Sequence, residues 1–179
     1  MGIIYFVIKI LTFPGTLFKA FLEHLTCRMF EIPVEFSKYI QKNELCGHIE
    51  HLLALHKGSF GICFMPHFMS LICGLIFVLP GSMNLFYLGK ANLFSYIFMY
   101  IGISCLANTF PLVEDAVNMW ENLYGENSEA KTVSKILLAV PACIMYAGAY
   151  LEKYGITLLT SIAFSYALPY GIAFVVQHI

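Results

Sequence analysis

Apolar residues fall in long blocks along this chain, and polar residues are gathered in the stretches between them. A block of about 20 apolar residues is long enough for an α-helix to cross the roughly 30 Å hydrocarbon core of a bilayer. Five blocks approach or exceed this length, at residues 3–30, 59–80, 92–109, 132–151 and 156–176. The pattern predicts an all-α polytopic membrane protein with about five transmembrane helices, built as a single domain over residues 1–179.

Two polar stretches between the blocks predict elements outside the hydrocarbon. Residues 31–58 follow the first block, and the alternation of VEFSKYI at residues 34–40 predicts a short strand. A turn at Lys42 and Asn43, followed by a second extended piece, would complete a β-hairpin. Residues 112–125 follow the third block and place apolar residues at helical spacing beside a polar face, which predicts an amphipathic helix in the membrane interface.

The last two blocks are separated by a short turn at residues 152–155. A turn of this length predicts that the two helices form an antiparallel hairpin. The small residues Ala147, Gly148 and Ala149 would let them pack closely.

Composition agrees with a lipid environment. Apolar residues make up 59% of the 179 residues and charged residues only 12%, against about 25% charged in a typical soluble domain. Contact with membrane lipids is therefore expected over much of the surface. The net charge of −1 and the lack of a basic stripe argue against a nucleic-acid partner.

The distribution of Lys and Arg predicts the orientation in the membrane. The stretches after the first and third blocks hold Arg28, Lys38, Lys42, Lys57, Lys131 and Lys135, whereas the opposite stretches hold Lys90 and Lys153. Residues 31–58 and 110–131 are therefore expected on the cytosolic side. An odd number of spans then puts the N-terminus outside and the C-terminus inside.

The first block carries charges in its middle, where a membrane helix rarely has them. Lys19 and Glu23 are four residues apart on one helical face and can form an ion pair, and His24 follows directly. An unpaired charge at this depth costs several kcal/mol. Asp115, the only aspartate, follows the third block and can reach back toward them. We expect a polar intramembrane cluster of these four residues, with Lys19 bridging the two carboxylates. Lys9 lies near the block's end and is expected to extend to the bilayer surface.

Two segments resemble a known family. TFPGTLFKAFLEHLTCRMFEIPV at residues 12–34 and LANTFPLVEDAVNMW at residues 106–120 resemble, in this order, the two motif segments of site-2-protease-like membrane zinc metalloproteases. The resemblance covers about residues 11–120 and leaves the last two blocks outside. In that family the first segment carries a His-Glu-x-x-His motif on a helix, and the second supplies an acidic residue near the zinc, which corresponds here to Asp115.

This chain departs from the family at the motif itself. The resemblance puts Lys19 at the first zinc histidine, Ala20 at the catalytic glutamate and Glu23 at the second histidine. A lysine ammonium has no lone pair for zinc, and alanine cannot accept a proton from water. The resemblance therefore implies a degenerate centre without the family's catalytic residues and without a metal.

Three functions follow as hypotheses. The first is a catalytically degenerate pseudoprotease that needs no cofactor and binds or scaffolds another membrane protein or complex. The second is an active metal-dependent membrane peptidase with zinc on a rewired site. The ligands of that site would be His24, His48, His51 and Asp115. The third is a small transporter, or an integral subunit of a larger membrane complex, with Lys19, Glu23 and Asp115 as an ion relay.

Overall fold

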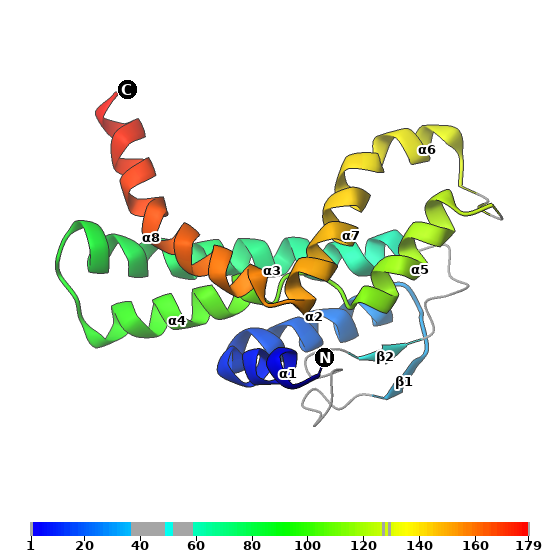
Figure 1. The fold of residues 1–179 in the computed structure, drawn as a ribbon, viewed down its shortest axis with the longest axis horizontal. Helices are drawn as coiled ribbons and strands as arrows, with labels where there is room; N and C mark the ends of the chain where they lie inside the picture. The colour runs from blue at the N-terminus through cyan, green and yellow to red at the C-terminus, as the bar shows by residue number, and fades with distance from the viewer. Residues whose placement is uncertain (1, 37–48, 52–58, 127, 129, 179) are drawn as a thin grey trace.

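The structure is a computed structural model that describes residues 2–36, 49–51, 59–126, 128 and 130–178. It confirms the prediction of a helical fold (Figure 1). The elements are α1 (Gly2–Leu11), α2 (Phe13–Met29), β1 (Val34–Phe36), β2 (Glu50–His51), α3 (Ser59–Ser82), the π-helical turn η1 (Met83–Tyr87), α4 (Leu93–Ala107), α5 (Val113–Tyr124), α6 (Thr132–Leu137), α7 (Ala139–Lys153) and α8 (Ile156–Gln177).

Two helices in the described part of the chain are long and apolar enough to cross a membrane. They cover Phe60–Tyr87, where α3 continues into η1, and Ile156–Gln177. A third span is counted if α1 and α2, bent by 96° at Thr12, are taken as one broken segment. The other predicted spans are shorter than expected: α4 and α7 have 15 residues each, or about 22 Å at 1.5 Å per residue.

Proline explains two of these interruptions. Pro14 lies at the start of α2 and Pro141 in the first turn of α7. Proline lacks the N–H of a helix interior and is accommodated at a helix start, so each of these blocks divides just before its proline.

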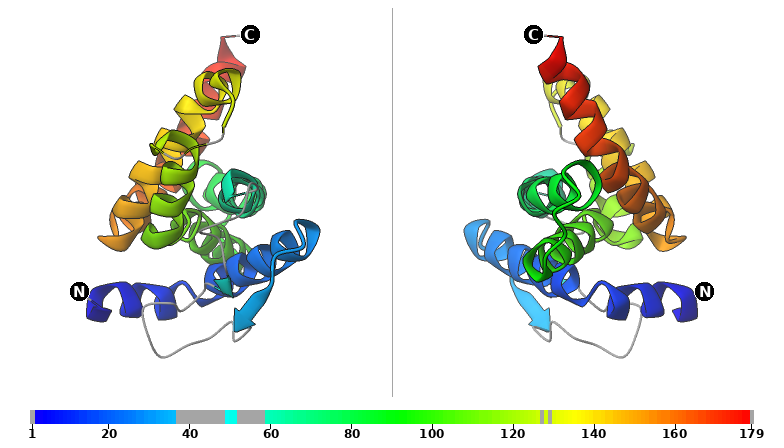
Figure 2. Two further views of the ribbon diagram at one scale, coloured as in Figure 1. Left: turned by 90° about the vertical axis from the view of Figure 1, so that its right-hand side faces the viewer. Right: turned by 90° about the vertical axis from the view of Figure 1, so that its left-hand side faces the viewer.

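The pair α3 and α4 forms the centre of the molecule. Figure 2 shows α1 and α2 on one side of this pair and the segment from α6 to α8 on the other. The two central helices pack closely because Gly102 has no side chain: a Cβ there would lie 2.6 Å from the Val78 backbone nitrogen. This tight pair is the support on which the interrupted segments are placed.

Three helix interruptions meet beside the C-terminal end of α4. The Gly15 N–H, at the start of α2, donates to Ser104 Oγ at 2.7 Å. Thr157 Oγ1, at the start of α8, donates to the Ala107 carbonyl at 3.2 Å. The end of α4 itself lies against the middle of α3, where Ser70 Oγ donates to the Cys105 carbonyl at 3.0 Å. The breaks between α1 and α2, α4 and α5, and α7 and α8 therefore lie at one level of the molecule.

The predicted antiparallel hairpin of the last two helices is wrong. From their shared corner α7 runs toward α5, whereas α8 runs toward η1, and the two diverge (Figure 1). The far half of α8 is tied to η1 by the Tyr170 hydroxyl, which donates to the Phe86 carbonyl at 3.2 Å. Gly148 does not pack on α8 but on the ring of Phe110. Helix α8 packs along α3 and α4, whereas α7 extends away from α3 and packs on α5 (Figure 1).

The polar stretch after α2 contains two paired strands. β1 and β2 are antiparallel, with Val34 opposite His51 and Phe36 opposite Glu50. The turn predicted at Lys42 and Asn43 lies outside the described residues. The helix predicted over residues 112–125 is confirmed as α5, which buries Ala116, Met119 and Leu123 on its inner face.

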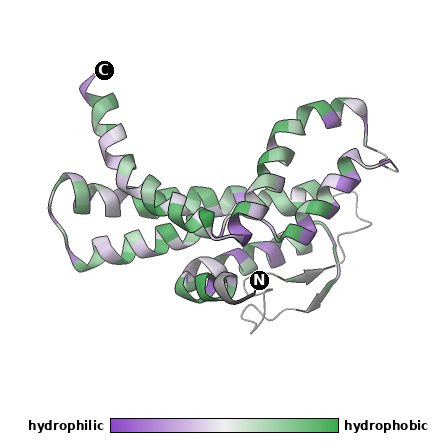
Figure 3. Cartoon of the chain, viewed as in Figure 1, coloured by the Kyte–Doolittle hydropathy of each residue, from purple (hydrophilic) through white to green (hydrophobic). Residues whose placement is uncertain are grey.

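Large apolar side chains remain exposed on the outer helices. Leu93 on α4 is 72% exposed, Leu137 on α6 74% and Leu159 on α8 68%. Figure 3 shows hydrophobic residues over most of α3, α4 and α8, with hydrophilic residues concentrated near α5 and the helix breaks. A surface of this kind is unfavourable in water and agrees with a lipid environment.

Candidate functional site: a buried lysine–carboxylate cluster

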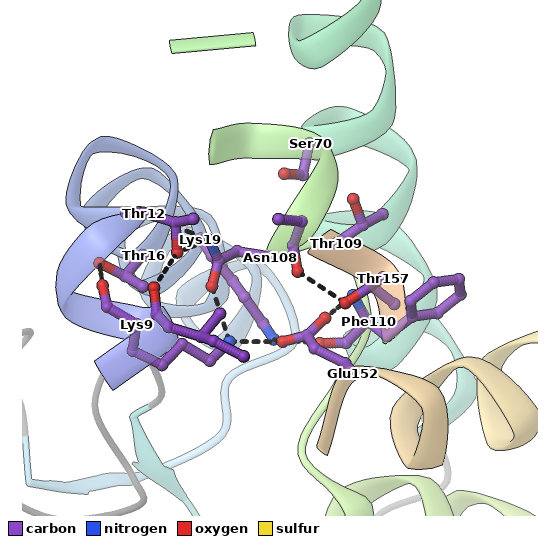
Figure 4. A network of polar contacts seen from close by, with 12 residues as sticks. Lys9, Thr12, Thr16, Lys19, Ser70, Asn108, Thr109, Phe110, Glu152 and Thr157 are labelled. Carbon is purple, nitrogen blue, oxygen red and sulfur yellow. Dashed lines mark hydrogen bonds and ion pairs between the residues drawn. The ribbon is translucent and has the colours of Figure 1, made fainter. Parts of the chain in front are cut away.

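Two lysines share one carboxylate in the interior. Lys9, Lys19 and Glu152 are each no more than 3% exposed. Glu152 Oε1 accepts a hydrogen bond from Lys9 Nζ and another from Lys19 Nζ, the latter at 3.2 Å. Glu152 Oε2 accepts from the Phe110 backbone N–H at 2.7 Å. Helix α1, helix α2 and the segment after α4 therefore all meet on the side chain of Glu152 (Figure 4).

Each lysine has a second partner in the cluster. Lys9 Nζ donates to Asn108 Oδ1 at 2.7 Å, and Lys19 Nζ donates to the Phe110 carbonyl. Asn108 is itself fixed, because its Nδ2 donates to Thr12 Oγ1 at 2.7 Å and to the Ser104 carbonyl at 2.8 Å. The ammonium groups are thus held at several points rather than by charge alone.

The cluster forms where it does because helix ends expose backbone groups that need partners. The Thr12 carbonyl, at the break between α1 and α2, accepts from Ser104 Oγ at 2.6 Å. Both backbone groups of Phe110, in the break after α4, are bonded to Lys19 and Glu152. In the interior of a membrane protein, irregular backbone is tolerated only with such internal partners. The polar side chains therefore satisfy backbone groups at both of these breaks.

Lys19 also faces a small cavity on its other side. The cavity has room for about one water molecule. It is lined by Lys19, Glu23, Ile62, Cys63, Pro66, Thr109, Pro111 and Asp115. The structure thus brings Lys19, Glu23 and Asp115 around one space, the three positions where the family resemblance expects zinc ligands. Glu23 Oε2 accepts from the Ile49 N–H at 3.1 Å, which ties α2 to the strand segment.

The remaining predicted site residues are placed as follows. Ala20 is fully buried on α2, and His24 is partly buried one residue after Glu23. His48 and the side chain of His51 lie outside the described residues, so the rewired metal site is untested. Within the part of the chain that the structure describes, no group of three His, Cys, Asp or Glu residues is arranged to hold a metal ion.

Three residues of the cluster were not predicted from sequence. Lys9, predicted to reach the bilayer surface, is 1% exposed, and Glu152, predicted only as part of a short turn, is 3% exposed. Asn108 was not singled out. A signal was present: each of these residues lies within a few positions of a helix-breaking Pro or Gly, at Pro14, Pro111 or Gly155. Polar residues beside breaks in apolar blocks are the groups that compensate those breaks.

Comparison with family models, with curated proteins and with solved structures gives no match to this chain. Function is therefore inferred from the residues themselves and from their geometry.

Proposed function

We propose that this protein is a multi-pass integral membrane protein, and a catalytically degenerate relative of site-2-protease-like zinc metalloproteases that binds or scaffolds another membrane protein. One observation carries the proposal. The buried ammonium of Lys19 is bonded to Phe110 and Glu152, at the edge of the cavity that Glu23 and Asp115 also line. This is the position where the resemblance expects the metal.

The chemistry of the cavity supports a loss of hydrolysis. A zinc peptidase needs neutral imidazoles and an open water position on the metal, with a carboxylate to take the proton of that water. Lys19 brings a positive charge to this position, and Ala20 has only a methyl group where the general base would stand. The cavity is also too small for zinc together with its water and a substrate. In this proposal a structural ion cluster stands where the family has its reaction centre.

Metal content tests the proposal. Purified wild-type protein is expected to contain no stoichiometric zinc. The double variant Lys19→His, Glu23→His places two imidazoles one turn apart, facing Asp115, and is expected to bind about one zinc per chain. Elemental analysis after dialysis against zinc measures both. Lys131→His, Glu121→His, on exposed positions, is the matched control. One zinc per wild-type chain would contradict the proposal.

The binding role is tested separately. Photo-crosslinking within native membranes, with the reactive residue on the exposed face of α8 at Leu159, is expected to yield an adduct with one membrane protein at fixed stoichiometry. A reactive residue at the buried position Met145 serves as the control. Only lipid adducts at Leu159 would contradict a scaffolding role.

For the membrane arrangement, residues 31–58 and 110–131 face the cytosol, and the C-terminus lies on the opposite side. The divergence of α7 and α8 from their corner (Figure 1) supports a single interrupted crossing by the two helices. An epitope tag after His178 is therefore expected to be accessible from outside intact cells, and a tag inserted at Ser128 only after permeabilisation. Accessibility of both tags from the same side would instead favour two full crossings by these helices.

A transport role is favoured by one observation of its own. Interrupted helices that meet at charged side chains near the middle of a bundle are typical of transporter binding sites. Reconstituted into vesicles that enclose a pH-sensitive dye, the protein is expected to show no proton flux if it is a pseudoprotease. Flux in the wild type that is lost on Glu152→Gln would replace the scaffolding proposal with a relay.

A further inference from the structure

Glu152 enters the cluster from a helix that does not carry any of the groups that bind it. Its helix, α7, packs mainly on α5 and α8, whereas its donors belong to α1, α2 and the segment after α4. One turn before Glu152, Gly148 lies against Phe110 so closely that a Cβ would be 2.1 Å from the ring. Gly148 and Glu152, one turn apart on α7, therefore both contact Phe110.

The three donors keep their positions through contacts that do not involve Glu152. Lys9 Nζ is held by Asn108, and Lys19 Nζ by the Phe110 carbonyl. The Phe110 N–H lies in the turn between the end of α4 and Pro111. Ser70 anchors this end of α4 on α3 and so fixes the position of the turn. The donors are thus preorganised, and preorganised donors bind an anion without the cost of ordering them.

We propose that Lys9, Lys19 and the Phe110 N–H form a carboxylate-binding site whose resident ligand is the side chain of Glu152. Two charged donors converge on one oxygen and a backbone N–H on the other, a pattern that matches the two oxygens of a carboxylate. The site takes a monocarboxylate of the size of formate once the Glu152 side chain is absent. The proposal stands on these contacts alone and does not depend on the loss of peptidase activity.

Chemical rescue tests the proposal in the full-length protein. Glu152→Gly removes the resident carboxylate and leaves space for a small one. The melting temperature of this variant is expected to fall relative to the wild type and to rise again with formate. Above the dissociation constant, each tenfold increase in formate should add a similar increment. Sodium chloride at equal ionic strength should have no such effect, and neither salt should shift the wild type.

Two further variants assign the effect to the site. Lys9→Met combined with Glu152→Gly removes one charged donor, and its response to formate is expected to be lost. Glu121→Gly removes an exposed carboxylate on α5 and should show no rescue. Equal responses to formate and chloride in Glu152→Gly, or a response to formate that survives Lys9→Met, would overturn the proposal.

The neutral isostere decides the question if Glu152→Gly gives no folded protein in either salt. Glu152→Gln keeps the shape of the side chain but carries no charge, so its melting temperature is expected to be well below that of the wild type. A melting temperature equal to that of the wild type would show that the site does not select a carboxylate, and would overturn the proposal.

Discussion

Replacing Lys19 with methionine is expected to lower the free energy of unfolding by about 3–5 kcal/mol, the range for removing one partner of a buried ion pair. Methionine fills a similar volume but removes the donor to Glu152 and to the Phe110 carbonyl. It also removes the positive charge beside the cavity that Glu23 and Asp115 line. In a protein of this size the melting temperature should fall by roughly 10 °C.

Lys131→Met is the matched control, because Lys131 is exposed in the segment before α6. Both variants are measured by thermal unfolding in detergent, with the fraction of protein that remains monodisperse as the readout. A Lys19→Met variant that melts with the wild type would show that the cluster contributes nothing to stability, and the idea that it replaces a metal centre would fail.

Replacing Gly15 with alanine is expected to destabilise the protein by roughly 3 kcal/mol or more, because the added methyl group meets backbone atoms. A Cβ at Gly15 would lie 2.0 Å from the Ser104 carbonyl oxygen and 2.8 Å from the Cys105 nitrogen. Neither atom belongs to a side chain that could rotate away. Moving α2 outward would break the bond from the Gly15 N–H to Ser104 Oγ and disturb the adjoining cluster.

Gly171→Ala makes the same substitution in α8, where no atom lies within 4 Å of the new Cβ. This control is expected to melt at the same temperature as the wild type or slightly above it, since alanine is the better helix former by up to about 1 kcal/mol. Gly15→Ala and Gly171→Ala can be compared by expression level and melting temperature. Equal melting temperatures for the two variants would contradict the close packing of α2 on α4.

The sequence grouped Lys19 with Glu23 and Asp115 but gave no indication of Glu152, for a physical reason. Lys19 and Glu23 are one helical turn apart, and their shared face follows from local geometry. Asp115 was linked to them by the second motif segment of the family resemblance. The contact of Glu152 with Lys9 joins residues 143 positions apart, and no local pattern indicates it.

The hydrophobic pattern also could not predict the number of membrane crossings. An apolar block of 20 residues has the same composition whether it forms one straight helix or two helices around a break. Pro14 and Pro141 mark where the chain can break. The bend at Thr12, in contrast, depends on partners such as Ser104 and Asn108 from a distant helix. The helical class was predictable because it depends on local periodicity, whereas the path of the chain depends on tertiary packing.

The late position of Glu152 has a consequence for biosynthesis. The two lysines that donate to it are synthesised more than a hundred residues before it. During that interval the Lys9 ammonium lacks the Glu152 carboxylate, and an ammonium group without a counter-ion costs several kcal/mol within the hydrocarbon. We therefore expect α1 to stay at the lipid surface, or bound to an insertion factor, until α7 is synthesised. The cluster is therefore complete only once α7 has joined the earlier helices.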